Sequence, residues 1–199
     1  MVVEKINALL ERYKTFVFFD YEFNIDRKPI QASFVITEYD SSSFQLKDEC
    51  SAYIKTDRKV HPYVKKITKI DDDLLKEKAT EYQYFLDDLL SKLNRFSKKV
   101  FISFGSEDIK VMYKNKNIQN RKYILFLNEI RKNYLNFKEE FCSHLKDDKG
   151  NVLSLMNIGL KEKLDMSNLH DAKADSCTMI KILNKMIEEE IGEKDDQIS

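Results

Sequence analysis

The stretch that decides the expected fold joins an apolar run to two acids: Thr15-Phe16-Val17-Phe18-Phe19-Asp20-Tyr21-Glu22. The run is β-prone and continuous, which is typical of a strand buried on both faces in the middle of a sheet. The strand is predicted to end at Asp20. Because side chains alternate along a strand, Asp20 and Glu22 should point to the same side. Such a pair can chelate a hard cation such as Mg²⁺, or can be two solvated acids at a strand end.

Further strands and helices are predicted around this central strand. Residues 31–39 and 44–55 read as strands with short links, so the first three strands predict an antiparallel meander. Apolar residues at helical spacing follow in 80–96, then a fourth strand at 99–104 and a helix from about Glu107. A meander followed by alternating helices and strands predicts an α/β fold, with a mixed sheet flanked by helices.

The C-terminal half of the chain is less clearly patterned. Residues 117–140 are ambiguous, with a strand near 134–137 and a helix after it. Two more helices are expected at 152–164 and 171–190. The polar tail 192–199 is expected to fray.

A chain of 199 residues favours a single domain, 1–199, with its core at about 15–190. A short amphipathic helix or arm is expected at 3–13. Residues 66–73 read as a loop, whose last three acids can cap the helix that follows. The sequence shows no internal repeat or low-complexity linker that would divide it.

Composition excludes several classes of protein. Hydrophobic residues make up 42% of the chain and glycine and proline are scarce, which disfavours disorder. Lysine plus arginine equals aspartate plus glutamate at 34 each, so net charge does not point to nucleic acid, although a local basic rim would suffice to hold phosphates. The odd cysteine set, Cys50, Cys142 and Cys177, favours free thiols in a reducing compartment. Without an apolar run of spanning length or a signal-peptide pattern, we expect a cytoplasmic protein with no membrane contact.

Other acids and a histidine lie where later elements begin. Asp108 follows the fourth strand at a strand-to-helix turn, where open α/β folds build sites, but Glu107 competes with it and either acid can simply favour a helix dipole. His170 and Asp175 lie at the start of the last helix, about 140° apart at 3.6 residues per turn. They can flank one site if His170 precedes the helix. Asp171 competes with Asp175, or is a helix-start acid.

The order of these pieces carries more information than any one of them. Residues 18–23 (FFDYEF), 103–112 (SFGSEDIKVM) and 169–176 (LHDAKADS) resemble the three motifs of the DEDDh exonuclease family that includes RNase T and DNA polymerase III epsilon. Residues 67–70 (ITKI) resemble the L-T-G-I stretch before the first long helix of these enzymes. The likeness covers about 15–187 and is greatest to the KapD-like and histone-mRNA-exonuclease-like group.

This resemblance implies a ribonuclease H-like fold with five strands and a metal-dependent 3′–5′ exonuclease. It implies two ions, Mg²⁺ or Mn²⁺, which would stabilise the attacking and leaving oxygens of a phosphodiester. Asp20 would bridge the ions, Glu22 and Asp175 would complete one site, and Asp108 would support the other. His170 would take a proton from the attacking water. The implied catalytic set is Asp20, Glu22, Asp108, His170 and Asp175.

The resemblance also implies the substrate, single-stranded RNA or DNA 3′ ends, with RNA slightly favoured. Phe23 and, more weakly, Phe104 are candidates to stack on the terminal base, or are core side chains. The chain departs from the group where it has Phe104 for Trp, Lys69 for Gly and Asn136 for Asp. The alternatives are a non-catalytic nucleic-acid-binding or regulatory protein on the same fold, and an unrelated α/β protein.

Overall fold

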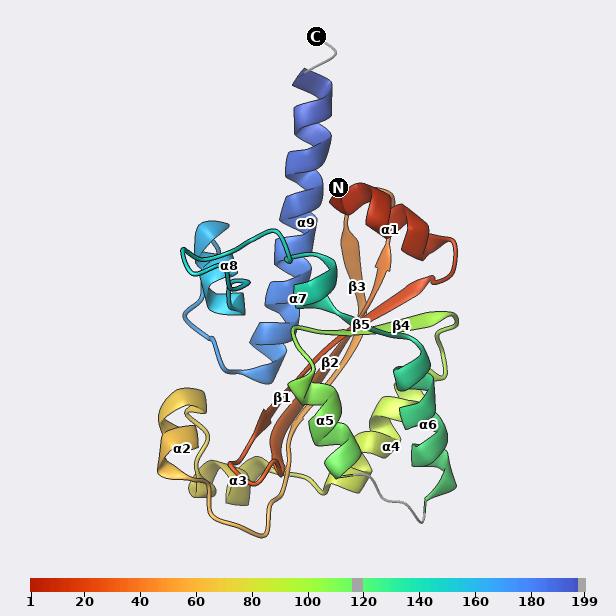
Figure 1. The fold of residues 1–199 in the computed structure, drawn as a ribbon. Coiled ribbons are helices and arrows are strands. Elements are labelled where there is room, and N and C mark those ends of the chain that lie inside the picture. The colour runs from red at the N-terminus through yellow and green to blue at the C-terminus, as the bar shows by residue number, and fades with distance from the viewer. Residues whose placement is uncertain (116–119, 197–199) are drawn as a thin grey trace.

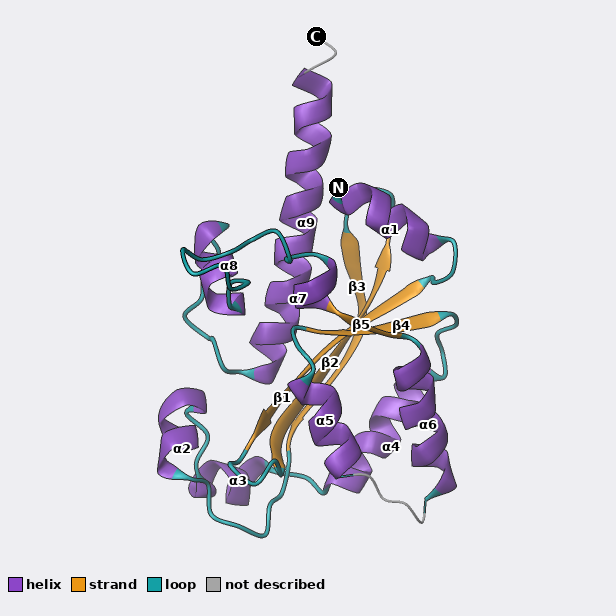
Figure 2. Cartoon of the chain, viewed as in Figure 1, coloured by secondary structure: helices purple, strands orange, loops and turns teal. Residues whose placement is uncertain are grey.

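The computed structural model describes residues 1–115 and 120–196. Within them, one mixed sheet has five strands in the order β3-β2-β1-β4-β5 (Figures 1 and 2). β1 pairs antiparallel with β2 and parallel with β4, β2 pairs antiparallel with β3, and β4 pairs parallel with β5. The predicted α/β class, the meander and the central place of the first strand are confirmed. The strands are β1 Thr15–Phe23, β2 Pro29–Tyr39, β3 Phe44–Tyr53, β4 Lys99–Ser103 and β5 Tyr134–Asn136.

Helices cover both faces of the sheet (Figure 1). Side chains of α4, α5 and α6 form one apolar cluster with one face, and those of α1, α7, α8 and α9 form a second cluster with the other. Helices α2 and α3 pack around a smaller cluster near the start of β2. The helices are α1 Val2–Leu10, α2 Pro62–Thr68, α3 Asp72–Lys78, α4 Tyr82–Leu93, α5 Glu107–Lys114, α6 Arg121–Lys132, α7 Phe137–Glu140, α8 Leu155–Lys161 and α9 Ala172–Asp196.

The alternation along β1 sets the direction of its acids. Val17 and Phe19 belong to the cluster under α4–α6, whereas Phe16 and Phe18 belong to the cluster under α9. All four are fully buried. Side chains alternate along the strand, so the even-numbered residues that follow, Asp20 and Glu22, also lie on the α9 face.

The structure corrects two predicted boundaries. β1 does not end at Asp20 but continues to Phe23, because β2 goes on pairing with it beyond the apolar run. Residues 66–73 are not one loop, since α2 extends to Thr68 and α3 starts at Asp72. Between them, Lys69 has a φ of 63°, the left-handed region that favours glycine. Asp71 caps α3 as expected, accepting a hydrogen bond from the Leu74 amide at 2.9 Å.

Helix α6 corrects the ambiguous segment 117–140. Tyr123, Phe126, Leu127 and Ile130 bury one stripe of this helix against the sheet, at the spacing of an amphipathic helix. The letters YILFL at 123–127 are also β-prone, which hid that spacing. The predicted strand after it is β5, and α7 follows directly. Residues 117–119 of the segment lie outside the described residues.

Helix α9 is longer than predicted and extends past the rest of the molecule (Figure 1). It continues to Asp196, so residues 192–196 are helical where fraying was expected, and 197–199 lie outside the described residues. Glu190 ties the helix to the start of α1, accepting hydrogen bonds from the Val2 and Val3 amides at 2.6 and 3.1 Å. Among the described residues, no helix combines the length and apolar character needed to cross a membrane.

Candidate active site

Asp20 and Glu22 are the acids that β1 contributes. Both are largely covered by the surrounding protein. Burial raises the pKa of Asp20 well above its ordinary value, and the carboxylates of Asp108, Glu22 and Asp175 raise it further. Burial, followed by Asp175 and Asp108, raises the pKa of Glu22 to about 9. Both acids of β1 therefore lie in the field of acids from other elements.

Asp108 reaches β1 at the point where β4 leaves it. The β1–β4 pairing ends at Phe18 and Ile102, and the chain then turns into α5. The Tyr21 amide, beyond the end of that pairing, donates to Asp108 Oδ1 at 3.1 Å. Asp108 is 7% exposed, and burial raises its pKa to about 7 although the Tyr21 amide lowers it. Asp108 thus replaces a lost strand partner of β1.

Glu107, the competing acid, points elsewhere. It is half exposed and forms ion pairs with Arg27 at 2.7 Å and Lys110 at 2.6 Å. The hydrogen bond from Lys110, together with the charge of Arg27, lowers the pKa of Glu107. The structure therefore directs Asp108, and not Glu107, toward the acids of β1.

The start of α9 contributes His170 and Asp175. His170 precedes the helix with a φ of 65°, and Asp175 lies in the first turn. The strained backbone of His170 is of a kind that costs about 1–3 kcal/mol and clusters at functional sites. Asp171 takes the helix-start role, because its Oδ1 accepts from the Ala174 amide at 2.9 Å. This is the alternative that the sequence left open for Asp171.

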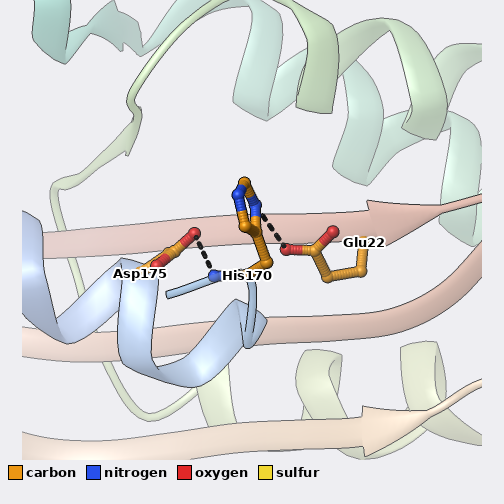
Figure 3. Close-up of side chains that lie close together, drawn as sticks. All are labelled: Glu22, His170 and Asp175. Atoms are coloured by element: carbon orange, nitrogen blue, oxygen red, sulfur yellow. Dashed lines mark hydrogen bonds and ion pairs between the residues drawn. The ribbon is translucent and has the colours of Figure 1, made fainter. Parts of the chain in front are cut away.

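Glu22, His170 and Asp175 come together, each offering one ligand atom within 4.8 Å of the others. His170 lies between the two carboxylates (Figure 3). Its Nδ1 is 4.0 Å from Glu22 Oε1, and its amide donates to Asp175 Oδ2 at 3.3 Å. Asp20 and Asp108 are not part of this compact group. Their carboxylates interact with those of the group by charge repulsion, which contributes to the raised pKa values.

The donor set fits a hard divalent cation. Asp175 Oδ1 is buried and has no hydrogen-bond partner among the described residues, and burial raises the pKa of Asp175 to about 7. A buried carboxylate oxygen without a partner is costly, and a cation would both satisfy it and relieve the repulsion between the acids. Burial also lowers the pKa of His170, whose side chain is 46% exposed. A neutral imidazole beside a carboxylate cluster can accept a proton near neutral pH.

The two candidate stacking residues lie in different surroundings. Phe23 is half-buried against the cluster under α4–α6, on the side opposite to the even-numbered row of β1. This packing favours the core alternative for Phe23. Phe104 is half-buried on the α9 face, with its ring centroid 6.2 Å from that of Phe137.

Gln31 on β2 is a residue that sequence reasoning missed. It is 6% exposed and lies opposite Glu22 in the β1–β2 register. Its amide group donates to Asp171 Oδ2 at 2.7 Å and accepts from the Ala172 amide at 3.0 Å. Nothing in the sequence singled Gln31 out, because it is one polar residue at the start of the predicted strand 31–39.

Solved structures share the fold of this chain. No protein-family model matches the chain, and no curated protein matches it in sequence. The nuclease domain of 3′hExo, a DEDDh family member bound to rAMP, superposes with a TM-score of 0.61 at 15% identity, over 89% of this chain and 92% of that one. The chain has the fold of a DEDDh 3′-exonuclease.

Two further structures extend the DEDDh comparison. Cell-death related nuclease 4 gives a TM-score of 0.65 at 17% identity, over 89% of this chain and 65% of that one. E. coli exonuclease I in complex with a dA16 oligonucleotide gives a TM-score of 0.66 at 16% identity, over 87% of this chain and 40% of that one. This chain therefore spans less than two thirds of these two proteins. The predicted ribonuclease H-like fold is confirmed.

Proposed function

We propose that this protein is a metal-dependent 3′–5′ exonuclease that removes nucleotides from single-stranded nucleic acid, with RNA slightly favoured over DNA. The observation that carries the proposal is the group of Glu22, His170 and Asp175, whose ligand atoms lie within 4.8 Å of one another, with Asp20 and Asp108 near enough for the carboxylate charges to interact. Structural stability alone does not require such a cluster, since mutual repulsion and burial both oppose it.

The residues have distinct proposed roles. Asp20, Glu22, Asp108 and Asp175 would hold two ions, Mg²⁺ or Mn²⁺, because oxygen ligands suit hard cations. When bound, the ions would supply charge stabilisation for the attacking and leaving oxygens of the phosphodiester.

His170 would accept the proton of the attacking water. Burial lowers the pKa of this imidazole, which favours its neutral form, and general-base work typically contributes ~10²–10⁴-fold in rate. The His170 side chain is 46% exposed and that of Glu22 only 13%, which supports access of a nucleic acid end to the proposed proton acceptor from the solvent.

The structural neighbours support a nucleic-acid substrate. The 3′hExo domain is bound to rAMP, a second 3′-exonuclease structure concerns 3′-end recognition of a histone mRNA stem-loop, and exonuclease I is in complex with a dA16 oligonucleotide. RNA is favoured by the likeness of residues 103–112 to the histone-mRNA-exonuclease-like group. Phe104 is the proposed stacking residue for the terminal base, with Phe23 the weaker candidate in view of its packing.

The test uses RNA and DNA oligonucleotides labelled at the 5′ or the 3′ end, incubated with Mg²⁺ or Mn²⁺ and with EDTA. We expect a ladder of shortened 5′-labelled products, mononucleotide from the 3′ label, and no reaction in EDTA. Asp20→Asn, purified in the same way, controls for a contaminating nuclease. Binding of oligonucleotide without any metal-dependent cleavage would instead support a non-catalytic protein on this fold.

A further inference from the structure

Glu22 and Gln31 are neighbours across the β1–β2 ladder, and they make contact with the start of α9 in different ways. Glu22 approaches His170 without a hydrogen bond, since its Oε1 is 4.0 Å from Nδ1. Gln31 instead makes two hydrogen bonds to the helix start, at 2.7 and 3.0 Å. Those two bonds join the sheet to the segment that carries His170, the candidate general base.

The two bonds from Gln31 fix both position and orientation. A side-chain amide that donates through Nε2 to Asp171 and accepts through Oε1 from the Ala172 amide cannot rotate without losing both contacts. Asp171 in turn caps the helix through the Ala174 amide, and its backbone carbonyl accepts from the Asp175 amide at 2.9 Å. The contact therefore extends from the sheet to the first turn of α9.

The position of the candidate site depends on this chain of contacts. His170 immediately precedes Asp171, and Asp175 lies one turn after it, so both move with the helix start. The His170 amide also donates to Asp175 Oδ2 at 3.3 Å, a bond that does not tie either residue to the sheet.

We propose that Gln31 is a positioning residue: its two hydrogen bonds to the start of α9 place His170 and Asp175 against Glu22. The expected effect of Gln31 on catalysis rests on the proposed function. Its expected effects on Mn²⁺ affinity and on the mobility of the α9 start do not. Partners that orient a ligand from outside the ion's own contacts typically contribute about 10–100-fold in metal affinity or activity.

The test compares Gln31→Met with a matched control on the same strand. Methionine keeps the length and burial of the side chain and removes both hydrogen bonds. Thr37→Val also removes a buried hydrogen bond of β2, from Thr37 Oγ1 to the Phe16 carbonyl at 3.0 Å, at a distance from the α9 start. The measurements are Mn²⁺ affinity by calorimetry, amide hydrogen exchange of residues 168–175 without metal, and kcat and KM on an oligonucleotide.

For Gln31→Met we expect Mn²⁺ affinity to fall by about 10–100-fold, faster exchange at 168–175, and a loss that falls on kcat rather than KM. Thr37→Val should match the parent in all three, apart from its thermal stability. Asp171→Asn is a second variant, because Oδ1 still caps the helix while every orientation of Gln31 then loses one bond. It should show the same changes to a smaller degree.

Two results separate this inference from the proposed function. If Gln31→Met equals Thr37→Val in Mn²⁺ affinity and in exchange, the positioning role is overturned even if the parent is an exonuclease. If no oligonucleotide is cleaved but Gln31→Met still weakens Mn²⁺ binding and speeds exchange, the positioning role stands and the exonuclease proposal fails.

Discussion

The start of α5 and the start of α9 both bring an acid to β1, and they hold it differently. Asp108 accepts a hydrogen bond from the Tyr21 amide and so takes the place of a strand partner of β1. Asp175 keeps one buried oxygen without a partner among the described residues, beside a histidine with strained backbone. The α5 side is thus built into the sheet, whereas the α9 side packs onto it through the apolar face of the helix and, at the helix start, through Gln31 and the Lys173–Glu49 ion pair.

This difference sets the two sides of the proposed site apart. β1 and α5 supply acids whose positions follow from strand pairing. α9 supplies the group proposed to move a proton, on a segment whose register with the sheet depends on side-chain contacts. Loss of an acid from β1 or α5 should therefore remove the proposed ion site, whereas loss of the His170 side chain should impair the chemistry and leave ion binding largely intact.

The largest effect is expected at β1, from Asp20→Asn. Hydrolysis should become undetectable, since a carboxylate proposed to hold the ions is lost. The metal-free variant should also melt at a higher temperature than the parent, because a neutral amide escapes the burial and repulsion that raise the pKa of Asp20. A gain of 1 kcal/mol corresponds to about 2–4 °C for a protein of this size. Calorimetry in EDTA and a cleavage assay measure both. A variant that cleaves normally would refute the site.

The next effect is expected at the start of α9, from His170→Asn. Asparagine tolerates the left-handed backbone of this position, so the fold and Mn²⁺ affinity should persist. Cleavage should slow by ~10²–10⁴-fold, and the defect should shrink at higher pH as hydroxide competes with the base. His144→Asn, at an exposed histidine, is the matched control and should cleave like the parent. A pH-independent defect would argue against a general base.

A smaller effect is expected on stability as pH changes. The pKa values of Asp108 and Asp175 rise from 3.8 to about 7, and that of Glu22 from 4.5 to about 9. Between these limits the folded state binds more protons than the unfolded state, so the free energy of unfolding falls as pH rises. In EDTA, the melting temperature should be lower at about pH 8 than at about pH 5, and Mn²⁺ should restore more stability at the higher pH.

Asp108→Asn sharpens this pH comparison. Its amide oxygen can still accept from Tyr21, while the charge that opposes folding is gone. The slope of melting temperature against pH in EDTA should therefore be shallower than in the parent. An unchanged slope would show that Asp108 does not contribute to the repulsion.

The smallest effect is expected from Glu107→Ala. This acid is half exposed and pairs with Arg27 and Lys110 at the surface, where an ion pair contributes about 0–1 kcal/mol. Cleavage rate and Mn²⁺ affinity should match those of the parent. Loss of activity in a folded Glu107→Ala protein would show that the assignment of the second motif is shifted by one residue.

The sequence by itself determined the core of the fold and the direction of its first two acids. An unbroken apolar run at 15–19 had to be a central strand, because both of its faces need burial, and alternation then put Asp20 and Glu22 on one side. The sequence did not determine α6, whose β-prone letters masked a helical stripe that only packing against the sheet reveals.

Only the tertiary structure decided how the distant acids meet. Asp108 and Glu107 are adjacent and alike in sequence, and the end of β4 pairing, which frees the Tyr21 amide, directs Asp108 inward. Likewise, nothing local to α9 places it against Glu22. That depends on contacts with the sheet, among them the two hydrogen bonds with Gln31, about 140 residues earlier in the chain. Local patterns encode which face a side chain takes, whereas contacts between distant segments encode which side chains share a site.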